Sequence, residues 1–139
     1  AGMAATYVRD MRPSLWEKFM LASAIGGVGA ACGLPAGKLC GDATALDMLR
    51  GALTEIQKLA KTSGIHLPPE TAAQTLDFIR TFPSHATSSL QRDLEAHRRS
   101  EYDHLTGAVL RFAAAADIPV PVHQRVDELI RKRGLNPDL

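Results

Sequence analysis

Lys18 is the first residue with a position that suits a catalytic role, because its ammonium group directly precedes an otherwise apolar segment. No residue from Phe19 to Ala36 is charged, and this run includes Gly26, Gly27, Gly29 and Gly33. A lysine in this position is either the solvated end of a helix or a proton donor in a site. Polar partners further along the chain would favour the second interpretation. Ser89 and Glu101 are candidates, because each is expected at the start of a helix, where side chains can converge.

The glycines suggest a dinucleotide-binding motif that fails on inspection. Gly27-Val28-Gly29 begins like G-x-G-x-x-G, and Asp47 lies twenty residues after the first glycine. However, Cys32 occupies the third glycine position, and no strand precedes the run. A glycine costs a helix about 1 kcal/mol relative to alanine, so the run needs a packing reason. We expect the close approach of another helix or chain.

Cysteine and histidine do not form a metal-binding pattern. Cys32 and Cys40 are the only cysteines, and no C-x-x-C or H-x-x-x-H pair occurs. We therefore expect no metal site. All five histidines are interpreted as surface or hydrogen-bonded polar residues: His66, His85, His97, His104 and His123.

The candidate residues must be positioned by helices, because the apolar residues recur at helical spacing and no segment alternates like a strand. The first helix carries Trp16 and Lys18 and ends at Gly33. It is capped either by Asp10, with Pro13 in the first turn, or by a Ser14–Glu17 capping box. The following helices are expected over residues 45–59, with Asp42 as N-cap and Gly64 at the end, and over residues 71–81.

Three more helices are expected in the second half of the chain. Thr87, Ser88 and Ser89 can cap a helix over residues 90–97. A capping box from Ser100 to Asp103 predicts the next helix, with Glu101 in its first turn and an inward stripe of Leu105, Val109, Phe112 and Ala116. The last helix is expected over residues 122–133, with Val126, Leu129 and Ile130 inward. The predicted fold is an all-α single domain of about six helices.

The length, composition and net charge of the chain limit the class of protein to which it can belong. A chain of 139 residues forms one domain with a real core, and 45% hydrophobic with 22% charged residues is typical of a soluble globular protein. A net charge of +1 argues against nucleic-acid binding. The uncharged run is too short, and too interrupted by glycine and Pro35, for a membrane span. With two cysteines and no signal-peptide pattern, we expect a cytoplasmic protein.

Three segments resemble the C-terminal domain of the ketopantoate reductase (2-dehydropantoate 2-reductase) family. They are LWEKF, PAGKL and SSLQRDLEAHRRSEYDHLTGAVLRFAAAADIPVP, and the resemblance runs from about Val8 to Arg131. The last segment is the most specific. It combines a Ser-Ser pair with Asp93, an arginine before Ser100-Glu101, a glycine in the next helix and an I-P-x-P turn, all at the family's spacing.

The resemblance implies a helical domain similar to the C-terminal domains of the 6-phosphogluconate dehydrogenase-like superfamily. Residues 1–14 would end an interdomain linker and start a helix, and residues 15–139 would form the substrate-binding and dimerisation domain. Such a domain packs on an N-terminal Rossmann domain, which is absent from this chain. NADPH is expected mainly on that missing domain in the full-length protein, and no cofactor is expected in this chain. The expected partners are a small 2-keto acid, the Rossmann domain and a second copy in a homodimer.

The resemblance also assigns roles to the candidate residues. Lys18 matches the general acid that protonates the ketone oxygen, Glu101 matches the glutamate that supports this lysine, and Ser89, with Ser88, matches the substrate-binding position. A lysine with few charges around it is partly desolvated, which favours the neutral amine, and a nearby carboxylate restores the charge. A positive Lys18 would also stabilise the developing alkoxide.

The chain departs from the pantothenate-pathway enzymes where those enzymes hold substrate with asparagines. The four positions carry Ala22, Gly26, Ala36 and Ala86. A 2-keto acid related to ketopantoate, or another carbonyl compound, is therefore as good a candidate substrate as ketopantoate itself. The alternative to an enzyme domain is a stand-alone, non-catalytic helical module that dimerises through its glycine-rich face.

Overall fold

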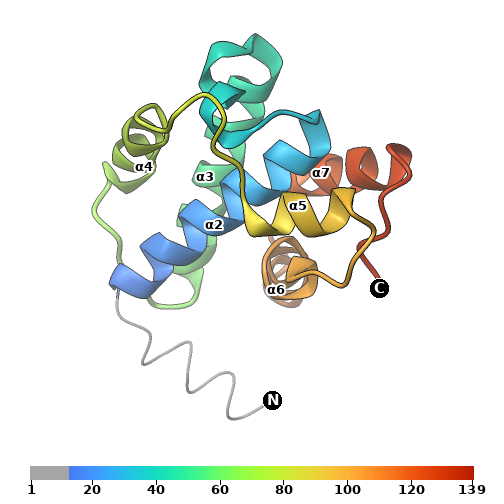
Figure 1. The fold of residues 1–139 in the computed structure, drawn as a ribbon. Coiled ribbons are helices and arrows are strands. Elements are labelled where there is room, and N and C mark those ends of the chain that lie inside the picture. Colours follow the sequence, from blue (N-terminus) through green and yellow to red (C-terminus); the bar gives the residue numbers. More distant parts are fainter. Residues whose placement is uncertain (1–12) are drawn as a thin grey trace.

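The computed structural model describes residues 13–139, which form helices and no strand (Figure 1). The elements are α2 (Pro13–Cys32), η1 (Ala36–Gly41), α3 (Ala43–Thr62), α4 (Thr71–Ile79), α5 (Ser89–Glu95), η2 (Tyr102–His104), α6 (Thr106–Ala116) and α7 (Pro121–Lys132). The all-α prediction is confirmed. Most of the expected linker over residues 1–14, including its proposed cap Asp10, lies outside the described residues.

Helix α2 passes through the middle of the domain, and α3, α5 and α7 pack against it (Figure 1). Its second half is buried from Ser23 to Ala31 without interruption. Ser14 already lies inside this helix, so the predicted Ser14–Glu17 capping box is wrong. None of the helices that the structure describes is both long enough and apolar enough to cross a membrane.

The glycines of α2 allow other helices of the chain to approach closely. A Cβ atom at Gly26 would lie 2.8 Å from Cδ2 of Leu90 in α5, and one at Gly27 would lie 2.9 Å from Oγ1 of Thr106 in α6. The prediction of a close approach is confirmed, and the neighbours are helices of the same chain. Because Gly26 and Gly27 are buried in this way, the expectation that the glycine-rich face forms a dimer is wrong.

Local signals predicted the ends of α3 correctly. The Asp42 carboxylate accepts a hydrogen bond from the Ala45 N–H at 2.8 Å, and Gly64 follows the helix with φ +85°. The core is built largely on the inner face of this helix, where the buried side chains include Leu49, Leu53, Ile56 and Leu59.

The segment before α6 differs from the prediction. Ser100 does not cap an α-helix: its Oγ accepts the Tyr102 N–H at 3.3 Å, and only the short 3-10 helix η2 follows. Leu105, at φ −116° and ψ −96°, interrupts the helical path, so α6 begins at Thr106. Glu101 therefore precedes η2 and is not in the first turn of α6.

The inward face of α6 was also predicted incorrectly. Val109 is buried as expected and Leu105 is half-buried, but Phe112 is 36% exposed and Ala116 is exposed. Other residues of the helix face the core instead, among them Thr106, Ala108 and Ala113.

The last helix agrees with its prediction more closely. It spans Pro121–Lys132, with Val126 and Ile130 buried and Leu129 half-buried, and Gly134 follows with φ +78°.

Candidate functional site

Lys18 lies in the second turn of α2 with an exposed side chain. It borders a shallow hollow of about 340 Å³, which α4 closes on the other side with Thr71, Gln74, Thr75 and Phe78. The expected desolvation of Lys18 is therefore not provided by the described part of this chain. Any cover over the amine must come from another segment or molecule.

Helix α5 begins close to α2, at a point further along α2 than Lys18. Lys18, Ala22 and Gly26 follow one another at intervals of four residues, so they lie on one side of the helix. At Gly26 this side meets Leu90, the residue after Ser89. With a rise of about 1.5 Å per residue, Lys18 lies roughly 12 Å along α2 from this crossing. The start of α5, which carries Ser89, thus packs on α2 about two turns beyond Lys18.

The two serines at the start of α5 are in different situations. Ser88 is the N-cap, and its Oγ accepts the Gln91 N–H at 3.1 Å. This confirms the predicted cap and gives Ser88 a structural role. Ser89 is the first residue of the helix and is exposed, so its hydroxyl is accessible to a ligand.

Glu101 borders a second, larger hollow of about 790 Å³. Arg99, Tyr102, His104 and Asp127 also border it, whereas Lys18 and Ser89 do not. Among residues 13–139, no ion pair joins Lys18 to Glu101. The structure therefore places Lys18 and Glu101 at separate hollows, and Ser89 borders neither of them. The convergence of all three stays a prediction.

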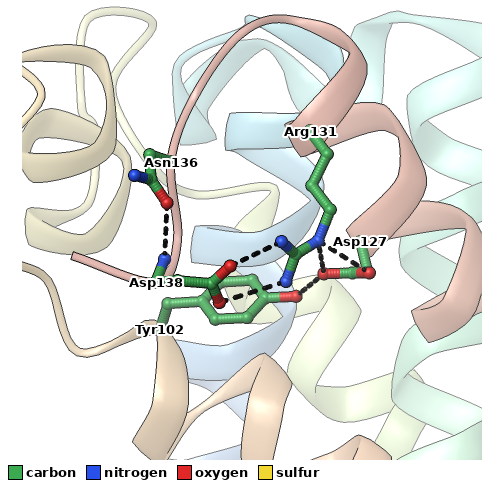
Figure 2. A network of polar contacts seen from close by, with 5 residues as sticks. All are labelled: Tyr102, Asp127, Arg131, Asn136 and Asp138. Carbon is green, nitrogen blue, oxygen red and sulfur yellow. Dashed lines mark hydrogen bonds and ion pairs between the residues drawn. The ribbon is translucent and has the colours of Figure 1, made fainter.

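The hollow of Glu101 is also bordered by a polar network that sequence reasoning missed. Figure 2 shows the residues of this network. The hydroxyl of the buried Tyr102 donates a hydrogen bond to the Asp127 carboxylate. The Nε atom of Arg131 lies 3.0 and 3.1 Å from the two Asp127 oxygens, and its Nη1 lies 2.7 Å from Oδ2 of Asp138. The spacing of Asp127 and Arg131, four residues apart in one helix, was a detectable signal. The partner of Tyr102 was not, because it lies 25 residues away in sequence.

The contacts within this network shift the pKa values of its residues. Burial, together with the hydrogen bond to the Asp127 carboxylate, raises the pKa of the Tyr102 phenol far above its ordinary value. The hydrogen bond between Arg131 and Asp138 raises the pKa of the guanidinium and lowers that of the Asp138 carboxyl. Tyr102 therefore remains a neutral hydrogen-bond donor between two charged groups.

A second polar cluster lies in the core, between α3 and α7. The Glu55 carboxylate accepts hydrogen bonds from the backbone N–H groups of Val122 and His123, at 2.8 and 3.0 Å. One of its oxygens also lies 2.7 Å from Nδ1 of His123. Glu55 therefore caps α7 from another helix. His123 is buried and its Nδ1 is paired with Glu55, so of the two predicted situations, surface or hydrogen-bonded, it is in the second.

The glycines, cysteines and histidines considered for a cofactor or metal site do not form one within the described chain. Gly27 and Gly29 are buried inside α2, so they do not form the strand-turn-helix loop of a dinucleotide fingerprint. No group of three metal-ligating side chains is gathered anywhere in residues 13–139.

The four positions at which the resemblance implies asparagines are Ala22, Gly26, Ala36 and Ala86. Ala22 is exposed, Ala36 is buried and Ala86 is half-buried. The carbonyl of Ala86 accepts the Gly37 N–H at 3.3 Å, so the turn before α5 contacts η1. At Gly26, Leu90 already occupies the space in which a side chain would begin.

Comparison with known proteins identifies the family. The family model for the C-terminal domain of ketopantoate reductase, described as "Ketopantoate reductase PanE/ApbA C terminal", matches residues 10–134. This chain therefore belongs to the ketopantoate reductase C-terminal domain family.

Individual relatives agree with this assignment. The chain is 25% identical over 126 residues to a 2-dehydropantoate 2-reductase of Pyrobaculum aerophilum, covering 91% of the chain and 45% of the relative. It is 27% identical over 130 residues to one of Halobacterium salinarum, covering 94% and 43%. The chain thus spans less than half the length of these curated relatives.

Solved structures share the fold. A ketopantoate reductase of the PanE/ApbA family from Ralstonia eutropha matches with a TM-score of 0.75 and 32% identity, over 86% of this chain and 40% of that one. A dimeric ketopantoate reductase from Staphylococcus aureus matches with a TM-score of 0.78 and 15% identity, over 86% and 42%. The second likeness is one of fold alone.

Proposed function

We propose that this chain is the substrate-binding and dimerisation domain of an NADPH-dependent reductase that converts a 2-keto acid into a 2-hydroxy acid. The observation that carries the proposal is the family match over residues 10–134. Because the chain spans less than half of its curated relatives, a Rossmann domain elsewhere in the protein would bind the nucleotide. The chain is inactive without that domain, and the full-length protein is a cytoplasmic homodimer.

In this proposal Lys18 is the general acid. When bound, NADPH supplies the hydride that adds to the keto carbon, and Lys18 donates a proton to the carbonyl oxygen. The exposure of Lys18 supports this role, because its amine is open to a substrate and to a second domain that would cover it. Such cover would remove water and strengthen the interaction between the ammonium and the developing alkoxide.

Ser89, Ser88 and Glu101 complete the proposed site. The exposed Ser89 hydroxyl, at the start of the helix that packs on α2 at Gly26, would donate a hydrogen bond to the substrate carboxylate. The Ser88 oxygen is used in capping α5, but its O–H proton is free to contribute. In this proposal Glu101 supports Lys18, and its carboxylate keeps the lysine protonated.

We propose a substrate that differs from ketopantoate in how it is held. At Gly26, the side chain of Leu90 fills the space that an asparagine would need. The alanines at positions 22, 36 and 86 offer no hydrogen bonds. A 2-keto acid with a more apolar substituent fits these residues better than one with a hydroxyl that needs partners.

The test is hydride transfer by the protein encoded by the complete open reading frame. We expect it to oxidise NADPH in the presence of one or more 2-keto acids, with higher kcat/KM for an apolar 2-keto acid than for ketopantoate. The isolated chain of residues 1–139 should be inactive with the same panel. Failure of the complete protein to reduce any 2-keto acid would overturn the proposal, and so would full activity of the isolated chain.

A further inference from the structure

The position of the Glu101 side chain is set by the backbone to which it is attached and not by contacts of its own. The side chain is exposed and makes no hydrogen bond to another residue in the described part of the chain. The residue lies in the short connection between α5 and α6, where it accepts the His104 N–H through its carbonyl at 3.0 Å. A glutamate used in a reaction must be held within a fraction of an ångström of its working position. Its neighbours in the chain must therefore supply the constraint.

The first constraint is Tyr102, the next residue. Its ring is buried, its N–H is bonded to Ser100 Oγ, and its hydroxyl is bonded to Asp127 of α7. Asp127 is itself fixed through both carboxylate oxygens by Arg131, and Figure 2 shows this arrangement. The backbone beside Glu101 is thus tied to a helix that lies far from it in the sequence.

A second constraint acts two residues after Glu101. Arg111 of α6 contacts the Asp103 carboxylate at 2.5 Å and donates a further bond to the Asp103 carbonyl at 2.9 Å. Gly107 leaves room for this contact, because a Cβ there would lie 3.2 Å from the same carboxylate. The segment after Glu101 is therefore held from two helices.

Stability alone does not require the polar part of this arrangement. The hydrogen bond of a buried hydroxyl contributes only modestly once desolvation is counted, and an ion pair whose side chains are 45% and 24% exposed contributes little to stability. A fully paired polar network instead specifies one geometry. In this protein the geometry that it specifies is that of the residue beside Glu101.

We propose that Tyr102, Asp127 and Arg131 are positioning residues that hold Glu101 in place for the reaction. The inference rests on the proposed function, in which Glu101 supports Lys18. It adds a role for three residues that act through Glu101 and do not touch the substrate.

A double-mutant cycle in the complete protein tests this role. Tyr102→Phe removes only the hydroxyl and leaves the ring in the core. We expect it to lower kcat by about three- to tenfold, below the roughly hundredfold cost of a 1 Å displacement. In a Glu101→Gln background the same change should have no further effect on kcat. The matched control is Arg125→Gln, which breaks an exposed ion pair with Glu128 on α7 and should leave kcat unchanged in both backgrounds.

Asp127→Asn provides a second variant in the same cycle, and melting temperatures of all variants separate folding from positioning. Equal fold-losses of kcat in both backgrounds would overturn the inference, because a general structural role acts independently of Glu101. Unchanged kcat in Tyr102→Phe would overturn it as well. If Glu101→Gln alone leaves kcat unchanged, or the unmodified protein reduces no 2-keto acid, the proposed function fails and the inference fails with it.

Discussion

Replacement of Glu55 should be the most damaging single change to a polar residue of this domain. The Glu55 carboxylate accepts two backbone N–H groups of α7 and contacts His123 Nδ1, and the His123 side chain is only 2% exposed. In Glu55→Ala these buried or partly buried donors lose their acceptor. An unsatisfied buried polar group costs about 1–3 kcal/mol, so we expect a loss of about 3–5 kcal/mol in the free energy of unfolding.

Two further variants test the cause of this loss. Glu55→Gln keeps one acceptor oxygen and should cost about half as much. Glu128→Ala removes an exposed glutamate of α7 that is paired with Arg125 at 3.0 Å, and should cost at most about 0.5 kcal/mol.

Urea unfolding of the chain, followed by circular dichroism, measures these differences. With a slope of about 1–3 kcal/mol per molar urea, the Glu55→Ala midpoint should fall by at least about 1 M while the slope is unchanged. A Glu55→Ala loss below about 1 kcal/mol would refute the account of Glu55 as the cap of α7. A loss equal to that of Glu128→Ala would do the same.

Two other predictions concern packing and pH. Gly26→Ala should lower the melting temperature, because overpacking against Leu90 costs about 1–3 kcal/mol and outweighs the gain of about 1 kcal/mol in helix propensity. The control Gly41→Ala should not lower the melting temperature, because the space around Gly41 is open. An unchanged melting temperature in Gly26→Ala would contradict the close packing. The raised pKa of Tyr102 means that its neutral form stabilises the fold fully below the ordinary value of 10.0 and that this stability is lost as the pH rises above that value. Urea midpoints measured across this range should fall more steeply for the native chain than for Tyr102→Phe, and parallel curves would contradict the burial of a neutral phenol.

The sequence was most informative where a structural signal is local. Asp42 and Ser88 were predicted as caps, and both accept the expected backbone N–H three residues on. Ser100 carries the same local signature and was predicted wrongly, because the backbone turns at Leu105 before an α-helix can form. The inward face of α6 was misjudged for a related reason. In a helix that ends in four alanines, hydrophobic periodicity has little contrast, and Phe112 lies on the outer side.

Contacts between distant residues could not be predicted. Glu55 and His123 are 68 residues apart, and nothing in either local sequence identifies the partner. The same holds for Tyr102 and Asp127. The candidate site shows the same limit, because the start of α5, with Ser89, packs on α2 through a contact between Gly26 and Leu90 that only the structure shows. The joint action of Lys18 and Glu101 stays a prediction.

The most direct test of the central claim is the turnover of a Lys18→Ala variant of the complete protein, with the substrate that gives the highest kcat/KM. A general acid contributes about a hundred- to ten-thousandfold, so kcat should fall at least about a hundredfold. Lys132→Ala, which removes another exposed lysine at the end of α7, should leave kcat unchanged. A Lys18→Ala enzyme with the turnover of the unmodified protein would contradict the assignment of Lys18 as the proton donor.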